Sequence, residues 1–441
     1  MKRYRAYKPT GTNWISSVPI TWDVKKIVHL FSQRKEKVSD RDFPPLSVTK
    51  NGILPQLDNA AKTDDGDNRK RVCVGDFVIN SRSDRKGSCG VSALEGSVSL
   101  INIVLHPRSQ LTGNYAHYLL RSQPFSEEFY RNGRGIVADL WTTRYSEMKT
   151  ILLPVPPREE QDQIVRYLDW QVSKINRLIA AKRKEIERIQ EHLDKSIEIM
   201  FDEIASSSND SIPLGRHITS IESGTSVNSI MGTADNDSIG VLSTSCVYGN
   251  NFDLSQNKRV APSDYGRVSC PVKKNTLIIS RMNAPSLVGA CGFSEKDDTR
   301  VYLPDRLWQV RFDNALMPEY AWRYLSTKRI KSWFATIATG TSSSMKNITK
   351  PQLKSIQIPF PSLEKQAETV RRIKTLCDKC NVACHVFEES IMHLIDLRTR
   401  LISDVVTGRV DVRGIEVPEF EMVRDTVEEQ EEDAEEIMQE T

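Results

Sequence analysis

The 441-residue sequence lacks the short motifs that mark most nucleotide-dependent and hydrolytic enzymes. It has neither a GxxxxGK[ST] phosphate loop nor a GxGxxG turn opening a helix. The tetrapeptide [DNS]PP[YFW] of amino-methyltransferases is missing, as are HExxH and GxSxG. Seven histidines are scattered without the spacing of a metal site or of a base–nucleophile pair. These absences favour a protein that binds over one that catalyses.

Long apolar runs are also missing. No run approaches the ~18 residues that suggest a membrane-spanning helix, and the basic N-terminus MKRYRAYKPTGTNW has no apolar signal stretch. Eight irregularly spaced cysteines in a long chain indicate reduced thiols, not a disulfide framework. We therefore expect a cytoplasmic protein of two or more domains.

Charge is distributed unevenly along the chain. The whole sequence has 61 basic and 58 acidic residues, but 11 of the acidic residues and one base, Arg424, lie at 419–441. The rest of the chain therefore has a net charge of about +13, against +3 overall. A basic body with an acidic tail suggests a polyanionic partner, and a solubilising tail on an ordinary surface explains the charge equally well.

A long helix is expected from 153 to 204, after a proline-rich stop. No proline or glycine follows Pro157 in this stretch. Apolar residues recur in steps of three and four, as in coiled coils, with Lys182 and Ser196 in the gaps. About 45 residues at 1.5 Å each give a rod of roughly 65 Å. The apolar seam is Val172, Ile175, Ile179, Ile186, Ile189, Leu193 and Met200.

The same pattern returns 205 residues later, so the partner helix is predicted within the chain. Its seam is Cys377, Cys380, Cys384, Ile391, Leu394 and Val405, and Phe387 answers Lys182. The entry to the helix repeats as well, because Pro154, Pro156, Glu159 and Gln161 correspond to Pro359, Pro361, Glu364 and Gln366. Matching entry and matching phase make a chance repeat implausible.

The parts between the helices repeat more weakly. GDFVINSR at 75–82 is expected to be a strand, and NTLIISR at 275–281 matches it at an offset of 199. The stretch 98–105 is a further expected strand, and 114–121 and 125–130 are expected to be short helices. In contrast, 32–70 and 219–270 share almost no identity. A repeated frame with divergent loops indicates two related sites that read different things.

These observations predict an α+β fold with two pseudo-twofold related globular domains, separated by two long antiparallel helices that form a coiled coil. The expected boundaries are 1–155 for the first domain, 156–206 for the first helix, 207–360 for the second domain and 361–410 for the second helix. Residues 411–441 are expected to form an acidic, disordered tail.

The cysteines of the second helix allow two interpretations. Cys377, Cys380, Cys384 and His385 could together hold Zn²⁺. However, all three thiols fall on the apolar seam, where cysteine packs as a small hydrophobe. We favour packing, and therefore expect no metal site.

Basic residues gather in the predicted loops of both domains, with neutral amides beside them. Lysine and arginine neutralise phosphates, and arginine and asparagine also contact base edges. The candidate DNA-binding residues are Arg69, Lys70, Arg82, Arg85, Lys86, Arg134, Arg144, Lys258, Arg259, Arg281, Asn283, Lys346 and Asn347. For any single residue, a solvated surface charge is the competing explanation.

The two helix entries LPVPPREEQ and IPFPSLEKQ, the strand GDFVINSR and the helix end LISDVVTGRVDVR resemble the specificity subunit of type I restriction-modification systems. The resemblance extends to about residue 414. It implies two target-recognition domains, each binding one half of a bipartite DNA site, with the helices as a ruler between them.

The resemblance also implies partners. Two modification (methyltransferase) subunits would dock on the helices, for which we expect the outward residues Arg177, Arg183 and Arg188, and restriction (motor-nuclease) subunits would join them. S-adenosylmethionine for adenine N6 methylation, and ATP and Mg²⁺ for cleavage, would belong to those partner subunits. Neither a catalytic residue nor a cofactor is expected in this chain.

Two other functions stay open from the residues alone. The chain could be a stand-alone DNA-binding regulator or a coiled-coil adaptor, which needs no methyltransferase. It could also be an enzyme that acts on nucleic acid by itself. The recognised sequence, the spacer length and the base-contacting loop residues cannot be read from the sequence.

Overall fold

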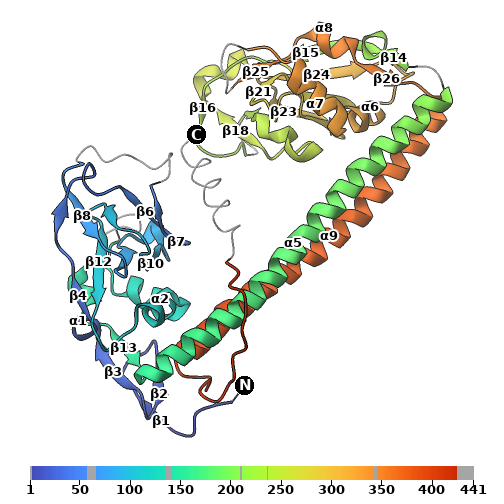
Figure 1. Ribbon diagram of the computed structural model, residues 1–441. Helices are drawn as coiled ribbons and strands as arrows, with labels where there is room; N and C mark the ends of the chain where they lie inside the picture. The colour runs from blue at the N-terminus through green and yellow to red at the C-terminus, as the bar shows by residue number, and fades with distance from the viewer. Residues whose placement is uncertain are drawn as a thin grey trace. The chain divides into compact units, whose positions relative to one another are not determined.

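The computed structural model describes residues 2–56, 66–135, 141–208, 211–235, 237–340 and 345–424. The chain divides into two compact units (Figure 1). Unit 1 comprises Met1–Lys184 and Phe387–Thr441, and unit 2 comprises Glu185–Val386. Each unit is an α+β globule that includes one half of each long helix.

The first helices and strands belong to unit 1. Its helices are α1 (Ile27–Leu30), α2 (Gly113–Arg121), α3 (Gln123–Arg131) and α4 (Tyr145–Met148). Its strands are β1 (Tyr7–Pro9), β2 (Ser17–Pro19), β3 (Asp23–Lys26), β4 (Phe31–Gln33), β5 (Lys37–Val38), β6 (Leu46–Thr49), β7 (Gly52–Pro55), β8 (Arg69–Val72), β9 (Phe77–Asn80), β10 (Cys89–Val91), β11 (Gly96–Val98), β12 (Asn102–Pro107) and β13 (Leu152–Val155).

Unit 2 has helices α6 (Pro318–Leu325), α7 (Lys328–Ile337) and α8 (Lys350–Ser355). Its strands are β14 (Ser211–Pro213), β15 (Ile218–Ser223), β16 (Ser229–Ile230), β17 (Gly240–Leu242), β18 (Asn257–Val260), β19 (Pro271–Val272), β20 (Thr276–Ser280), β21 (Met282–Asn283), β22 (Cys291–Ser294), β23 (Asp298–Tyr302), β24 (Leu307–Phe312), β25 (Lys346–Asn347) and β26 (Gln357–Pro359). The two long helices, α5 (Arg158–Ser208) and α9 (Leu363–Val406), pass through both units.

One four-stranded antiparallel sheet occurs in both units. In unit 1 its order is β10-β9-β12-β4, and in unit 2 it is β22-β20-β24-β15, which is the same order of equivalent strands. The short pair β13-β3 at the entry to α5 likewise matches β26-β14 at the entry to α9. The repeated frame predicted from the sequence is confirmed at the level of strand order.

A second sheet differs between the units. Unit 1 has the three-stranded sheet β11-β8-β5 and the hairpin β6-β7, whereas unit 2 has the five-stranded sheet β16-β18-β17-β23-β19 with one parallel pair. Most of these strands come from the stretches of low identity. Where their sequences diverge, the two units therefore differ in the number and order of strands, and not only in their loops.

The expected strand at 98–105 is wrong as a single element. A turn closed by the Asn102 N–H donating to the Ser99 carbonyl (3.0 Å) separates β11 from β12. The two strands belong to different sheets. Both strands are buried, so their apolar residues form one continuous run in the sequence. Such a run does not show whether it belongs to one long strand or to two short ones.

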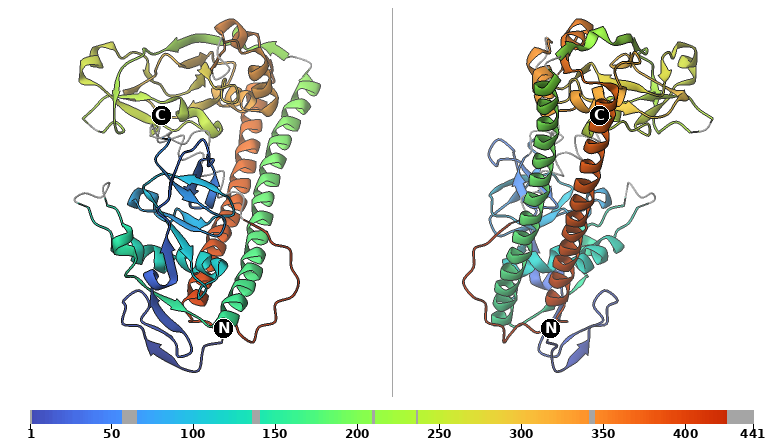
Figure 2. Two further views of the ribbon diagram at one scale, coloured as in Figure 1. Left: turned by 60° about the vertical axis from the view of Figure 1, so that its left-hand side comes forward. Right: turned by 90° about the vertical axis from the view of Figure 1, so that its right-hand side faces the viewer.

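The long helices pair antiparallel, half in each unit (Figures 1 and 2). In unit 1, the Lys182 ammonium lies 5.4 Å from the centre of the Phe387 ring, as the seam predicted, and Arg398 donates to the Asn176 Oδ1 at 2.7 Å. In unit 2, Ile189 and Cys380 line the same shallow groove. The residue numbers of facing pairs sum to nearly the same value, which is the signature of antiparallel register.

The ends of the long helices differ slightly from the expected positions. The helix α5 continues to Ser208, two residues beyond the expected boundary at 206. The helix α9 ends at Val406, and Gly408 two residues later has a φ of 75°, the left-handed conformation of a Schellman cap. The cap is closed by the Arg409 N–H donating to the Asp404 carbonyl at 2.8 Å. Any Cβ at Gly408 would also meet the Pro19 ring at 2.4 Å.

Candidate nucleic-acid interface

A buried glutamine joins each globule to its long helix. The Gln161 Oε1 accepts from the Thr112 N–H (2.9 Å), and its Nε2 donates to the carbonyls of Gln110 and Pro156 (3.0 and 2.9 Å). The Gln366 Oε1 accepts from the Met317 N–H in the same way. Both side chains are almost fully buried. The repeated Pro-x-Pro-x-x-Glu-x-Gln motif therefore fixes how each globule sits on its helix entry.

A buried tyrosine from the neighbouring helix completes this joint. The Tyr115 hydroxyl of α2 donates to the Val406 carbonyl (3.1 Å), and the Tyr320 hydroxyl of α6 donates to the Pro359 carbonyl (3.0 Å). Burial, and for Tyr115 the nearby charge of Glu160, raises the pKa of both phenols. Both tyrosines therefore remain neutral donors over the physiological range.

The central strand β9 corresponds to β20 at an offset of 200, not at the offset of 199 suggested by the letters. Cys89 lies opposite Ile79 in unit 1. Cys291 lies opposite Ile279 in unit 2. Three identities, of Ile79, Ser81 and Arg82 with the residues 199 positions later, had aligned the two strands one residue out of register.

Backbone hydrogen bonds confirm the corrected register. The Thr143 N–H donates to the Ser81 carbonyl (2.9 Å), and the equivalent Ile348 N–H donates to the Arg281 carbonyl (2.9 Å). Arg281 therefore occupies the place of Ser81, and it is not the counterpart of Arg82. A one-residue slip reverses the face to which each side chain points, so the slip changes which basic residues can be compared.

Five of the predicted DNA-binding residues come together where β9 ends. The backbone of Thr142 bridges both Arg82 and Arg134, which holds the loop after β9 against the segment leading to α4. All five side chains are exposed. Arg134 is 84% exposed and has Glu147 3.7 Å away. We call this set the unit 1 loop surface: Arg82, Arg85, Lys86, Arg134 and Arg144.

Four predicted residues come together at the equivalent place in unit 2. The short strands β21 and β25 pair Asn283 with Lys346 and Met282 with Asn347. The Asn283 amide donates to the Tyr248 hydroxyl (3.0 Å), and the Arg281 Nε donates to the Asp305 carbonyl (2.6 Å). The buried Oδ1 of Asn347 has no hydrogen-bond partner within the described part of the chain. We call Arg281, Asn283, Lys346 and Asn347 the unit 2 loop surface.

Two predicted residues serve the interior of unit 1 instead. Arg69 is 5% exposed, and its guanidinium donates to the Ser97 Oγ (2.8 Å) and carbonyl (3.1 Å). The Lys70 ammonium donates to the carbonyls of Leu100 and Asn102 (2.7 and 2.6 Å). Burial lowers the pKa of both groups. We therefore correct their assignment: Arg69 joins β8 to β11, and Lys70 joins β8 to the turn between β11 and β12.

The remaining pair, Lys258 and Arg259, lies on β18 of the five-stranded sheet, apart from β21 and β25. Lys258 is exposed, whereas Arg259 donates to the Asp235 carboxylate at 2.5 Å. The structure thus places these two on the divergent sheet of unit 2.

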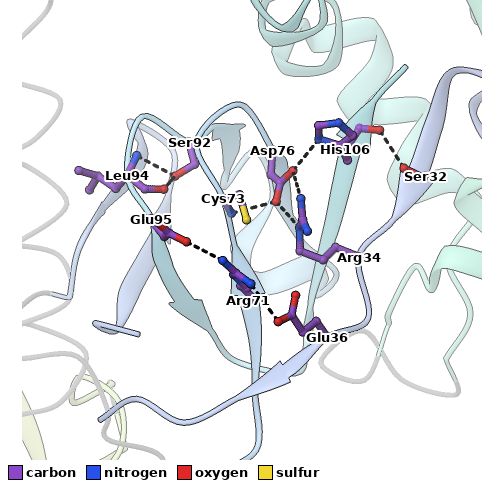
Figure 3. A network of polar contacts seen from close by, with 10 residues as sticks. All are labelled: Ser32, Arg34, Glu36, Arg71, Cys73, Asp76, Ser92, Leu94, Glu95 and His106. Atoms are coloured by element: carbon purple, nitrogen blue, oxygen red, sulfur yellow. Dashed lines mark hydrogen bonds and ion pairs between the residues drawn. The ribbon is translucent and has the colours of Figure 1, made fainter. Parts of the chain in front are cut away.

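A network around Asp76 was not predicted (Figure 3). The Asp76 carboxylate is fully buried, and it accepts from the Arg34 Nε and Nη2 (2.6 and 3.1 Å) and from the Cys73 N–H (2.9 Å). His106 lies 3.1 Å from it. The neighbouring Arg71 donates to Glu36 and Glu95, at 3.0 and 2.9 Å. The network fixes the turn between β8 and β9, at the start of the strand whose far end leads into the unit 1 loop surface.

The three arginines expected to meet partner subunits lie on α5. Arg177 is exposed and 3.8 Å from Glu421, and Arg188 donates to Glu185 at 2.6 Å. Arg183 is half-buried. Arg177 and Arg188 thus each have an acidic side chain of the same chain beside them.

The segment after α9 differs from the expectation of a disordered tail starting at 411. Residues 411–424, which we call the strap, lie along unit 1, with the Gln163 amide donating to the Val412 and Ile415 carbonyls (3.1 and 2.7 Å). Near its far end, Val423 is held by Ser173 and Asn176. Ser173 and Asn176 are buried polar residues beside the apolar seam, and their polarity is the sequence signal that could have predicted a bound segment there. The rest of the predicted tail, 425–441, falls outside the described residues.

The thiols on α9 are half-buried, and Cys377 packs against the core of unit 2. Cys380 lines an open groove of about 310 Å³ with Arg188, Ile189, His192, Lys379 and Ala383. Within the described ranges, no three His, Cys, Asp or Glu side chains stand close enough together to hold a metal ion. The same ranges contain no helix long and apolar enough to cross a membrane.

Known proteins resemble this chain in sequence. A family model, the type I restriction modification DNA specificity domain, matches residues 241–383, which extend from β17 into α9. The type I restriction enzyme EcoKI specificity subunit of Escherichia coli K12 is 22% identical over 322 residues, covering 70% of this chain and 68% of that protein. The family model and this relative both point to the type I restriction-modification specificity subunits.

One solved structure shares the fold of this chain. A chain solved to describe complex assembly and conformational transition of the type I R-M system has a TM-score of 0.55 at 17% identity, covering 89% of this chain and 99% of that one. The HsdS subunit from Thermoanaerobacter tengcongensis has a TM-score of 0.41, also at 17% identity, covering 89% and 98%. The matched family model is a DNA specificity domain, so the similarity agrees with a role in DNA recognition.

Proposed function

We propose that this chain is a specificity subunit that reads a bipartite, asymmetric double-stranded DNA site, with one half-site for each unit. The observation that supports this most directly is the four-stranded sheet that occurs in both units with unrelated second sheets attached. A common frame can present two loop surfaces in the same way, while different second sheets give them different specificity. The two loop surfaces, together with Lys258 and Arg259, supply the lysine, arginine and asparagine side chains that contact phosphates and base edges.

On this proposal, the long helices set the distance between the half-sites and carry the partners. Two modification (methyltransferase) subunits would dock on the helix pair near Arg183 and Arg188, and restriction (motor-nuclease) subunits would join them in the cytoplasm. S-adenosylmethionine, ATP and Mg²⁺ would be held by those partner subunits. The chain itself would supply recognition and scaffolding, without a catalytic residue.

A reconstitution tests the non-catalytic role. The purified chain is incubated with DNA and either S-adenosylmethionine or Mg²⁺, alone and with the modification subunit. We expect adenine methylation only when both proteins are present. Methylation or cleavage by the chain alone would contradict the proposal, and failure to bind any methyltransferase would favour a stand-alone regulator or an adaptor.

A matched pair of arginine substitutions tests the unit 1 loop surface. Arg82→Ala removes an exposed cation and is expected to weaken DNA binding and to reduce the slope of log K against log salt by about one. Arg69→Ala removes a buried side chain, so it is expected to cost about 1–3 kcal/mol of stability while the folded protein binds DNA normally. Salt-dependent binding titrations and urea unfolding separate the two effects, and the reverse pattern would contradict the assignment.

A further inference from the structure

A clamp on α5 holds the main chain near residue 423. The Val423 N–H donates to the Ser173 Oγ (3.1 Å), and the Val423 carbonyl accepts from the Asn176 Nδ2 (2.9 Å). Ser173 and Asn176 lie one helical turn apart and are 4% and 5% exposed. Both backbone polar groups of Val423 are therefore held by buried side chains.

Arg398 fixes the orientation of this clamp. Its Nη1 donates to the Asn176 Oδ1 at 2.7 Å. Because a guanidinium only donates, the amide must turn its oxygen to Arg398 and its NH₂ group to the strap. The clamp is thus built into the helix pair of unit 1 and recognises backbone.

Between its two attachment points the strap is largely exposed, and it bows away from the helices (Figure 2). Gln163 holds its start at Val412 and Ile415, and the clamp holds its far end. An exposed segment that is pinned at both ends fixes the starting point of the chain beyond it. That chain is the stretch 425–441, which has nine acidic residues and no basic residue.

The clamp places Arg424, the residue before this acidic stretch, near basic side chains. The charge of Arg424 is close enough to His117 that, after burial and Arg121, it helps to lower the pKa of that imidazole, which is about 3. Arg121 lies 3.1 Å from the His117 Nε2 and also donates to the Lys50 carbonyl. His117 and Arg121 thus connect the end of the strap to the Lys50 loop.

The Lys50 loop continues into the unit 1 loop surface. A Cβ at Gly87 would lie 4.0 Å from the Lys50 Cγ, and the exposed Arg85 and Lys86 immediately precede Gly87. We call Lys50, Arg85, Lys86 and Arg121 the basic rim. Seventeen residues reach up to about 55 Å when extended, so the rim is well within range of residue 424.

We propose that the basic rim of unit 1 is a docking surface for this chain's own acidic segment 425–441, which competes there with DNA. A tethered segment has an effective concentration in the millimolar range, so weak ionic contacts are enough to occupy the rim. DNA that binds the rim must displace the segment, and the displaced acids take up counterions. The segment therefore weakens binding to non-cognate DNA and makes it less dependent on salt. The consequence for DNA rests on the proposed function, whereas the docking does not.

Docking is measured first, without DNA, as the reactivity of lysines towards an acylating reagent read by mass spectrometry. We compare the full chain with a chain that ends at Arg424 and with a chain whose nine acids at 425–441 are replaced by their amides. Both changes are expected to raise the reactivity of Lys50 and Lys86 by about threefold or more at low salt, and 0.5 M salt should remove the difference because it screens the contacts. Asn176→Ala should give an intermediate rise, and Arg166→Ala, at an exposed position on α5, should give none.

Affinity for a random-sequence duplex is then measured on the same proteins. The truncated and amide chains are expected to bind about tenfold more tightly at low salt, with a steeper salt dependence. Unchanged reactivity of Lys50 and Lys86, or protection of Lys258 instead, would overturn the docking. Changed reactivity with unchanged affinity would overturn the competition, and failure of every chain to bind DNA would count against the proposed function and leave the docking standing.

Discussion

At the scale of single residues, the repeated helix entry shows why some positions recur and others do not. Gln161 and Gln366 each satisfy three backbone groups at the joint between globule and helix. Glu159 and Glu364 also recur, but both are exposed in the first helical turn, where a carboxylate stabilises the helix by only a few tenths of a kcal/mol to about 1 kcal/mol. Because the glutamine and the glutamate both recur, comparison of the two sequences could not show that only the glutamine is buried and hydrogen-bonded.

Gln161→Ala is therefore expected to be far more damaging than Glu159→Ala. The first substitution leaves one N–H and two carbonyls without a partner at a buried site, which costs about 2–4 kcal/mol. The second should cost less than about 1 kcal/mol. Urea unfolding of the two variants makes the comparison, and equal losses would refute the role assigned to Gln161.

His117 gives unit 1 a pH-dependent stability. The Val91 N–H donates to its Nδ1 at 3.3 Å, and Arg121 faces its Nε2, so an imidazolium would oppose donors on both sides. Burial is the largest cause of the lowering of its pKa from 6.5 to about 3. Between pH 3 and 6.5 the unfolded chain therefore binds the extra proton, and stability falls as the pH falls through this range.

The variant His117→Gln removes this titration. Relative to the variant, the natural chain is expected to lose up to about 2 kcal/mol of unfolding free energy between pH 7 and pH 5. Denaturant titrations at the two pH values provide the measurement. The exposed His393→Gln on α9 is the control and should follow the natural chain, while parallel curves for all three proteins would rule out the buried neutral imidazole.

At the scale of elements, the sequence predicted the helices far better than the sheets. The seam at Ile175, Ile179 and Ile391 is buried as expected, because a sustained 3.5-residue period is a local signal. The strand β9 was found, but its counterpart was placed one residue out of register, because a match of three letters outweighed pairing that only the neighbouring strands define.

The turn before the central strand shows why polar contacts of this kind could not be predicted from the sequence. In unit 1, the N–H of Cys73 is satisfied by the Asp76 carboxylate from within the same turn. At the equivalent place in unit 2, the Lys273 N–H donates to the Gln309 amide from β24 (2.8 Å). In unit 1 the acceptor for this backbone N–H comes from the same turn, and in unit 2 it comes from another strand. Only the acceptor in the same turn can be recognised from the neighbouring sequence. Arg69 and the strap were misjudged for the same reason, since their partners are distant in the chain.

The helices also give a prediction of their own. Inserting four residues at matching positions in α5 and α9 adds about 6 Å, close to two base pairs of DNA. We expect the unread gap to lengthen while both half-sites stay the same, because the loop surfaces are untouched. Methylation mapping that returned altered half-sites with an unchanged gap would argue against a ruler.

At the scale of the whole molecule, the chain consists of two units that share one four-stranded sheet and differ in their second sheet. The divergent stretches 32–70 and 219–270 contribute most of the strands by which the second sheets differ. If each unit reads its own half-site, a change confined to one unit should alter one half of the target and leave the other half unchanged.

The most direct test is genome-wide mapping of N6-methyladenine in cells that contain the modification subunit with either the natural chain or a chain whose 219–270 stretch comes from another specificity subunit. The account predicts a motif of two half-sites around an unread gap, absent without this chain, in which the exchange changes one half-site only. A continuous motif, or an exchange that altered both half-sites, would contradict it.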